Sequence, residues 1–244
     1  MKRIIIIGAS SGLGYAITQQ FASMGWQIGI AARREAPLQE LQSQYPDNII
    51  YTTIDVTTDN AIDKFNKLIE QNGGMDILLL ASGIGKQNPE LDISNEEITI
   101  KTNVLEFTRI VDTAFNYFKN KNTKGQIAVI SSVAGTKGLG IAASYSATKR
   151  FQNSYISALE QLANIKGLDI SFTDIRPGFI RTPLLDRDKN YPMIMSIEHV
   201  TPQIVNAILK RKRIAIIDWR WRIIVGLWRL IPHWLWVRLK IRNT

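Results

Sequence analysis

The chain has 244 residues, of which 45% are hydrophobic and 21% are charged, with no cysteine and two histidines. This composition predicts one folded domain with a sizeable core, and it excludes a disulfide scaffold, a thiolate zinc site, a cysteine nucleophile and a multi-histidine metal centre. The formal net charge of +9 lies at one end, because residues 210–244 hold ten basic side chains and one acid while the preceding residues are balanced.

The apolar pattern alternates between short runs typical of buried strands and longer stretches typical of helices. The expected strands cover residues 3–7, 27–31, 49–54, 76–81, 126–130, 169–173 and 214–217. The expected helices cover residues 13–24, 36–44, 61–71, 95–119, 144–165 and 202–211. This β-α-β alternation predicts an α/β fold, a doubly wound parallel sheet of about seven strands with helices on both faces.

The first residues give no sign of a secretory signal. Lys2 and Arg3 precede four isoleucines and then Gly8, and this apolar run is far shorter than that of a signal peptide. Together with the absence of cysteine, this start favours a cytoplasmic protein.

The first expected strand runs directly into a glycine-rich turn that opens a helix. Glycines let the backbone turn sharply and approach a diphosphate, and the helix N-terminus offers free amide groups. The spacing is Gly-x3-Gly-x-Gly, which differs from the commoner Gly-x-Gly-x2-Gly fingerprint of dinucleotide sites. The residues predicted to bind the dinucleotide here are Gly8, Ser10, Ser11, Gly12, Leu13 and Gly14.

Arg33 and Arg34 follow the second expected strand, and no acid precedes Glu35. In a dinucleotide fold this position faces the adenosine ribose, where an acid accepts the 2′-hydroxyl of NAD and an arginine accommodates the 2′-phosphate of NADP. The two arginines therefore favour NADPH over NADH. The alternative is that they are solvated charges at the start of the next helix.

Tyr145 and Lys149 lie four residues apart on an expected helix, so their side chains share one face. A free phenol has a pKa of about 10, and a nearby ammonium lowers that pKa and makes the phenol a better proton carrier. Upstream, a hydroxyl at Ser131 or Ser132 is suited to bind a substrate carbonyl. Asn103 lies in a helical run, either as an ordinary polar residue or as a distortion point that holds a water molecule in a proton relay.

Together these residues resemble the short-chain dehydrogenase/reductase family, over about residues 2–217. The glycine turn matches the family's cofactor turn, and four residues match its catalytic set in order and spacing: Asn103, Ser132, Tyr145 and Lys149. Ser132, rather than Ser131, has the family's interval of thirteen residues to the tyrosine. The resemblance adds further cofactor-binding residues: Asp55, Val56, Ala81, Ser82, Gly83, Tyr145, Lys149, Pro177, Gly178, Ile180 and Thr182.

The resemblance implies a Rossmann-type fold, and the family commonly forms homo-oligomers. The chain also departs from the family pattern. The family often has Asn-Asn-Ala-Gly after the fourth strand, where this chain has Leu80-Ala81-Ser82-Gly83, so a structural hydrogen bond is replaced or absent there. Ile7 stands where the family often has threonine. Neither change touches the proton or hydride chemistry.

The implied reaction is the NADPH-dependent reduction of a ketone to a secondary alcohol. Hydride passes to the carbonyl carbon and Tyr145 protonates the oxygen, while Lys149 lowers the pKa of Tyr145 and binds the nicotinamide ribose. Ser132 positions the carbonyl, and Asn103 holds the water that resupplies protons. Two other functions stay open: an idle NADPH-binding protein that docks on a membrane or protein partner, and a dehydrogenase that uses NAD to form the ketone. The complete catalytic set disfavours the first, and the two arginines disfavour the second.

The one long irregular stretch is residues 177–196, and its apolar part, residues 182–196, is predicted to be a substrate lid. Its leucines and methionines suit a long hydrophobic substrate, which favours a lipid-like ketone, although the segment is equally suited to internal packing. By analogy, lipid-handling members of the family such as the 3-ketosphinganine reductases are similar in having a membrane-associating end.

A basic arm, residues 218–244, follows the expected catalytic domain, residues 1–217, and holds five of the six tryptophans. Its longest uncharged run has eight residues and includes Pro232. A run of this length is too short to span a bilayer. We predict an amphipathic helix with arginines on one face and an apolar opposite face of Ile224, Leu227, Trp228 and Ile231. An anionic membrane surface is the favoured partner, and packing on protein is the alternative. Nucleic acid is not expected, because no supporting groove or motif is present.

Overall fold

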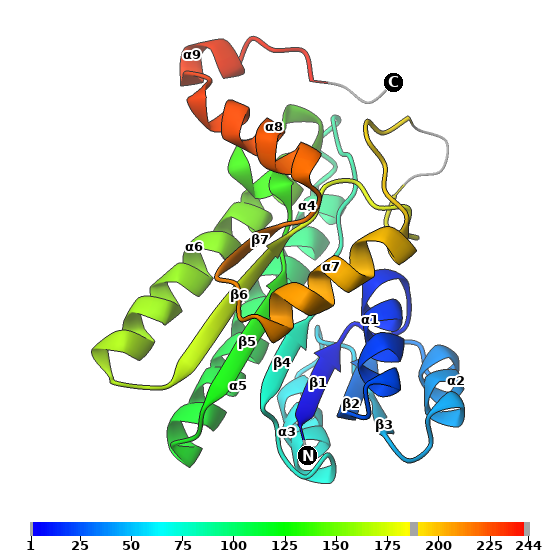
Figure 1. Cartoon of the computed structure of the whole chain (residues 1–244). Coiled ribbons are helices and arrows are strands. Elements are labelled where there is room, and N and C mark those ends of the chain that lie inside the picture. Colours follow the sequence, from blue (N-terminus) through cyan, green and yellow to red (C-terminus); the bar gives the residue numbers. More distant parts are fainter. Residues whose placement is uncertain (1, 186–189, 242–244) are drawn as a thin grey trace.

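A computed structural model describes residues 2–185 and 190–241. In these residues it contains one seven-stranded sheet in the order β3-β2-β1-β4-β5-β6-β7 (Figure 1), and every neighbouring pair is parallel. The strands are β1 (Arg3–Ile7), β2 (Gln27–Ala32), β3 (Ile49–Thr53), β4 (Ile77–Leu80), β5 (Gly125–Ile130), β6 (Ile170–Arg176) and β7 (Ile214–Ile216). The predicted doubly wound parallel sheet is confirmed.

Helices cover both faces of the sheet (Figure 1). One face carries α1 (Gly12–Ser23), α2 (Ala36–Gln44), α7 (Ile197–Leu209) and α8 (Trp219–Leu230). The other face carries α3 (Ala61–Gln71), α5 (Phe107–Lys121) and α6 (Ala143–Ile165). Two further helices are α4 (Ile93–Ile100), which precedes α5, and α9 (His233–Trp236), which follows α8.

The isoleucine run of β1 shows why this sheet reads as continuously apolar. Ile4 and Ile6 belong to the core on the α1 and α7 side, whereas Ile5 and Ile7 belong to the core on the α3 and α5 side. Successive strand residues point to opposite faces, so a strand that is covered on both sides must be apolar at every position.

Three boundaries differ from expectation. The expected helix over 95–119 is divided by a π-helical segment, Lys101–Glu106, which separates α4 from α5. β6 extends to Arg176, because Asp174 and Arg176 form a buried ion pair that allows charged residues inside the strand. α7 begins at Ile197 rather than at Pro202, because the Ser196 hydroxyl accepts a hydrogen bond from the His199 backbone N–H and caps the helix five residues earlier.

Neighbours β1 and β4 are not consecutive in the chain, so the order of the strands reverses between them. In open parallel sheets, ligands bind beyond the carboxyl ends of the strands at such a switch point. The connections after β1, β4, β5 and β6 meet at this end, and α8 and α9 lie beside them (Figure 1). None of the helices in the described ranges combines the length and apolar character that crossing a bilayer demands.

Candidate active site

A cleft of about 740 Å³ opens at the carboxyl ends of the strands. It is lined by every residue predicted above for catalysis and cofactor binding, with the exception of Asn103, which lies directly behind its wall. Residues far apart in the sequence, from Gly8 to Trp228, therefore meet in one place.

The glycine turn after β1 is shaped by two close backbone approaches. Gly8 has φ +98°, and a Cβ built on it would lie 2.5 Å from the backbone nitrogen of Ser82. A Cβ on Gly14 would overlap the carbonyl oxygen of Gly8. The turn brings the chain to the N-terminus of α1, whose first amide groups have no partner within the helix and are suited to a diphosphate. This cradle fits a dinucleotide.

The far end of the cleft, next to β2, carries two exposed arginines and one carboxylate. Arg34 Nη2 donates to the carbonyl oxygen of Ser10 at 3.1 Å, which ties this arginine to the glycine turn. Burial by itself raises the pKa of Asp55, but hydrogen bonds from Thr57 and the charge of Arg33 outweigh it and hold the pKa below its ordinary value. This end can therefore meet a ribose and an additional phosphate.

Asn103 sits in the π-helical segment and braces the loop after β4. Its Oδ1 accepts from the N–H of Ile84 at 3.0 Å, and its Nδ2 donates to the Ile84 carbonyl at 2.7 Å and to Thr148 Oγ1 at 3.2 Å. The chain is thus distorted at the position where the sequence suggested a distortion, and π-helical bulges are frequent at functional sites. These bonds fix Ile84 in a loop that lacks the family's usual asparagines.

Tyr145 lies in the first turn of α6, with its ring against the backbone of Gly85. Burial raises the pKa of the Tyr145 phenol, and a hydrogen bond with Ser132 offsets this only in part. The pKa of Tyr145 is therefore raised overall, whereas the sequence predicted a lowered pKa. The Lys149 Nζ lies 5.8 Å from the ring centroid and donates its hydrogen bonds to other groups, so burial outweighs its charge.

Lys149 is buried, with 4% of its surface exposed. Its Nζ donates to the Ile130 carbonyl at 3.2 Å and to Gln152 Oε1 at 3.0 Å. Burial lowers the pKa of Lys149 to about 8, and the negative charge of Asp174 opposes part of that shift. The ammonium is therefore held in place by two hydrogen bonds, and its pKa lies close to neutral pH.

Gln152 is a site residue that the sequence reasoning missed. Its Nε2 donates to the backbone carbonyl of Asn103 at 2.9 Å, while its Oε1 accepts from Lys149. The carbonyl of Asn103 thus already accepts one hydrogen bond from a side chain, and the water that Asn103 is expected to hold stays a prediction. The available signal was a polar residue three positions after Lys149, on the same helical face.

Ser131 and Ser132 face different surroundings. The Ser131 hydroxyl bonds to the Asp174 carboxylate and accepts from Asn153 Nδ2, in a buried network that also holds Arg176. Ser132 interacts with the phenol of Tyr145. The structure thus places Ser132, rather than Ser131, beside the tyrosine.

Comparison with known proteins decides the family. The family model described as short chain dehydrogenase matches residues 2–191. The chain belongs to the short-chain dehydrogenase family. It is 30% identical over 241 residues to an uncharacterized oxidoreductase of Mycobacterium tuberculosis, covering 95% of this chain and 94% of the relative. It is 29% identical over 194 residues to a farnesol dehydrogenase of Aedes aegypti, covering 75% and 79%.

Solved structures share the fold of this short-chain dehydrogenase. A short-chain dehydrogenase/reductase from Burkholderia phymatum in complex with NAD has a TM-score of 0.82 and 18% identity, covering 93% of this chain and 92% of that one. A short-chain dehydrogenase from Sphingobium yanoikuyae in complex with NADPH has a TM-score of 0.78 and 21% identity, covering 96% and 97%. The protein is accordingly an oxidoreductase of this family.

The predicted lid of this short-chain dehydrogenase is only partly described, because residues 186–189 of the segment 182–196 lie outside the described residues. Leu184, Leu185 and Tyr191 line the cleft. Met195 instead is buried in the core, and it forms an isolated parallel bridge with Ile180. The segment therefore combines cleft-lining and core-packing residues.

Unexpectedly for a peripheral arm, α8 forms part of the cleft wall. Trp221 and Trp228 line the cleft, and the Trp221 ring covers Gly178 so closely that a Cβ there would overlap it. Trp236 Nε1 donates to the Gly138 carbonyl at 2.8 Å, so α9 is also held on the domain. The predicted apolar face is divided: Ile224 and Trp228 pack on the domain, whereas Leu227 is 57% exposed. The buried face consists of Trp221 and Val225 with Trp228 partly buried, because the arm packs on the sheet side through these residues.

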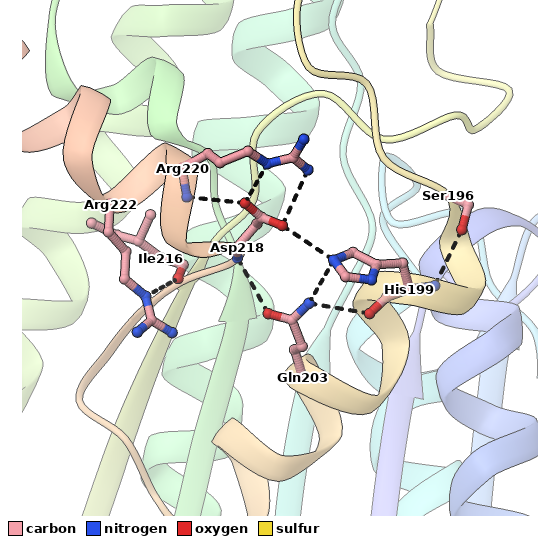
Figure 2. Close-up of polar contacts among 7 residues, drawn as sticks. All are labelled: Ser196, His199, Gln203, Ile216, Asp218, Arg220 and Arg222. Carbon is pink, nitrogen blue, oxygen red and sulfur yellow. Dashed lines mark hydrogen bonds and ion pairs between the residues drawn. The ribbon is translucent and has the colours of Figure 1, made fainter.

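Asp218 anchors the start of α8 (Figure 2). Its carboxylate accepts from Arg220 Nε at 2.8 Å and from His199 Nε2 at 3.1 Å, and its N–H donates to Gln203 Oε1 at 3.3 Å. The Arg220 hydrogen bond is the main reason that the pKa of Asp218 lies far below its usual range. A carboxylate only accepts, so His199 Nε2 carries the proton of this bond. The cluster ties the arm to α7.

Proposed function

We propose that this short-chain dehydrogenase reduces a ketone to a secondary alcohol with NADPH. The observation that carries the proposal is the meeting of a phenol, a hydroxyl and an ammonium, from Tyr145, Ser132 and Lys149, in a cleft that also contains the glycine cradle. The bound nicotinamide supplies hydride to the carbonyl carbon. The protein supplies the proton and the placement of the substrate.

The raised pKa of Tyr145 supports the direction of reduction. Reduction begins with a protonated phenol, and burial keeps the proton on the oxygen at neutral pH. As the proton leaves for the substrate oxygen, negative charge develops on the buried tyrosine oxygen. The Lys149 ammonium then stabilises this charge from behind the ring, and this interaction is stronger in the transition state than before it.

Ser132 is the residue that we propose to bind the substrate carbonyl. Its hydroxyl lies on the phenol side of the cleft wall, and the neighbouring Ala134 N–H donates to its oxygen at 3.1 Å. This second bond fixes the hydroxyl oxygen, while the hydroxyl proton is donated to the Pro177 carbonyl over a long distance of 3.5 Å, which a substrate carbonyl would replace. A carbonyl held by Ser132 and Tyr145 together presents its carbon to the same face of the cleft.

A preference for NADPH is proposed from Arg33 and Arg34. Both line the cleft end beside β2, where an extra phosphate on the adenosine ribose would lie. Arg34 is held near the turn by Ser10, whereas Arg33 lies beside Asp55 and contributes to its lowered pKa. A relative of the same fold is solved with NADPH and another with NAD, so the arginines rather than the fold carry this preference.

A lipid-like substrate is proposed from the apolar side chains in the cleft lining. Leu139, Ile141, Leu184, Leu185 and Trp228 all line the cleft. Apolar pockets of this size favour extended hydrocarbon ligands, and the farnesol dehydrogenase of Aedes aegypti is named for an apolar alcohol.

We further propose a cytoplasmic homo-oligomer, peripheral at a membrane, with residues 1–217 as the catalytic domain. Light scattering after size exclusion measures the oligomeric state.

The test is NADPH consumption with a series of ketones of increasing chain length. Turnover that rises with chain length supports both the reaction and the substrate class. Turnover of short polar ketones alone would contradict the lipid-like substrate but would still support the proposed ketone reduction. NADPH binding without turnover of any ketone would overturn the proposed reaction in favour of the idle binding protein.

A further inference from the structure

α8 has two apolar faces rather than one. Trp221, Val225 and Trp228, spaced four and three residues apart, form the inner face that packs on the domain. Trp219, Ile223, Leu227 and Leu230 repeat at intervals of four, four and three on the opposite side. Packing on the domain therefore accounts for one apolar face of this helix and leaves the opposite apolar face unexplained.

The outer face is strongly exposed. The exposed fractions are 65% for Trp219, 54% for Ile223, 57% for Leu227 and 78% for Leu230. Beyond α8, Trp234 and Val237 are also exposed, at 60% and 62%. Isolated exposed apolar residues are ordinary, but four large ones along one face of a single helix mark an interaction surface.

Positive charge accompanies this stripe. Residues 219–241 contain five basic side chains and no acid, and among them Arg222, Arg229, Arg238 and Lys240 are exposed. The adjoining acid, Asp218, is buried and paired with Arg220 and His199 (Figure 2). Arg229 forms no hydrogen bond or ion pair with the part of the chain that the structure describes, so its charge is free for a partner.

We propose that the outer face of the arm, defined by Trp219, Ile223, Leu227 and Leu230, docks on an anionic lipid surface. The tryptophan and aliphatic side chains enter the headgroup boundary, and the arginines beside them meet lipid phosphates. The helix then lies in the plane of the interface, because the described helices are too short or too polar to cross it.

Charge and chemistry favour lipid over the other occupants. A two-fold contact between copies would set the exposed basic side chains of the two arms against one another, and the one adjoining acid, Asp218, is already paired with Arg220. Nucleic acid would use the arginines but would leave Ile223, Leu227 and Leu230 in water, since phosphates gain nothing from aliphatic side chains. An anionic bilayer satisfies both the charge and the apolar stripe.

Docking would also serve the cleft, because the inner face of the same helix is a cleft wall. Trp228 lines the cleft, and Ile98 and Leu184 line it while being 44% and 46% exposed, which gives the opening an apolar rim. A lipid-like substrate would pass from the bilayer to this rim with little exposure to water. This consequence rests on the proposed reaction and substrate class, whereas the docking itself, which deepens the proposed membrane association, does not.

The experiment compares the full chain with two double variants. Ile223→Glu/Leu227→Glu places two charges on the outer face, and Ile165→Glu/Leu209→Glu places the same change at exposed positions on α6 and α7. Each protein is sedimented with vesicles of pure phosphatidylcholine, and with vesicles that contain one quarter phosphatidylglycerol. Circular dichroism melting and NADPH reduction of a water-soluble ketone are measured on the same samples.

Docking predicts that the wild type and the control variant bind the anionic vesicles and that added salt weakens this binding. The outer-face variant binds roughly tenfold or more weakly while its melting and its activity on the soluble ketone are unchanged. Equal binding by both variants would overturn the proposal, as would no binding by the wild type. A wild-type dimer that the outer-face variant dissociates, without vesicle binding, would assign the surface to a second copy. Vesicle binding without ketone reduction would refute only the proposed reaction.

Discussion

The amide of Gln152 is fixed in one orientation, and this makes its effect on Lys149 calculable. Nε2 must donate to the Asn103 carbonyl at 2.9 Å, which turns Oε1 toward the ammonium at 3.0 Å. A hydrogen bond to a charged group contributes about 1.5–3 kcal/mol, and about 1.4 kcal/mol corresponds to one pKa unit. Gln152→Met removes the acceptor, so the pKa of Lys149 should fall by about 1–2 units from its value of about 8.

The assay is the pH profile of kcat/KM for the ketone at saturating NADPH. The ammonium stabilises the tyrosine anion formed on proton donation, so the rate falls as pH rises through the pKa of Lys149. The alkaline limb should therefore move to lower pH in Gln152→Met and to higher pH in Gln152→Glu, whose carboxylate favours the ammonium. A uniform loss of rate with an unmoved limb would show a purely structural role and refute the reasoning.

Three further variants test other parts of the account. Gly8→Ala places a Cβ 2.5 Å from Ser82 N at a residue with φ +98°. Calorimetry should therefore show a free energy of unfolding lower by about 1–3 kcal/mol, and NADPH should bind more weakly. Arg33→Ala should raise KM for NADPH by roughly tenfold and leave KM for NADH unchanged in steady-state kinetics; an equal change for both would remove Arg33 from cofactor selection. Asp218→Asn should destabilise the fold by about 1–3 kcal/mol at neutral pH. Because the folded pKa of Asp218 is depressed, that contribution begins to be lost only as pH falls below the unfolded pKa of about 4, so the gap in melting between variant and wild type should start to narrow there, and a constant gap at lower pH would contradict it.

Much of the fold follows from local pattern. The isoleucines of β1 are apolar at every position, and this pattern occurs where helices cover both faces of a parallel sheet. The glycine turn could also be predicted from the sequence, since the close backbone approach at Gly8 and Gly14 requires residues without a Cβ. The sequence therefore predicted a doubly wound parallel sheet and the glycine turn that forms part of the cleft.

Other features depend on contacts between distant segments. The pKa of Tyr145 is set by burial beneath a loop sixty residues upstream at Gly85, and helical spacing to Lys149 carries no information on that burial. The sequence did not show which face of α8 becomes buried, because both of its faces are apolar and only contact with the domain selects between them. The role of Gln152 likewise depends on the carbonyl of Asn103, 49 positions away.

The central claim is that Tyr145 donates the proton to the substrate oxygen. Tyr145→Phe removes the hydroxyl and retains the ring that packs on Gly85, so the cleft and the cofactor site should persist. In single-turnover measurements with NADPH and a reducible ketone, the rate of NADPH oxidation should fall by about 10²–10⁴-fold while the Kd for NADPH stays within about twofold. A rate close to that of the wild type would contradict the account.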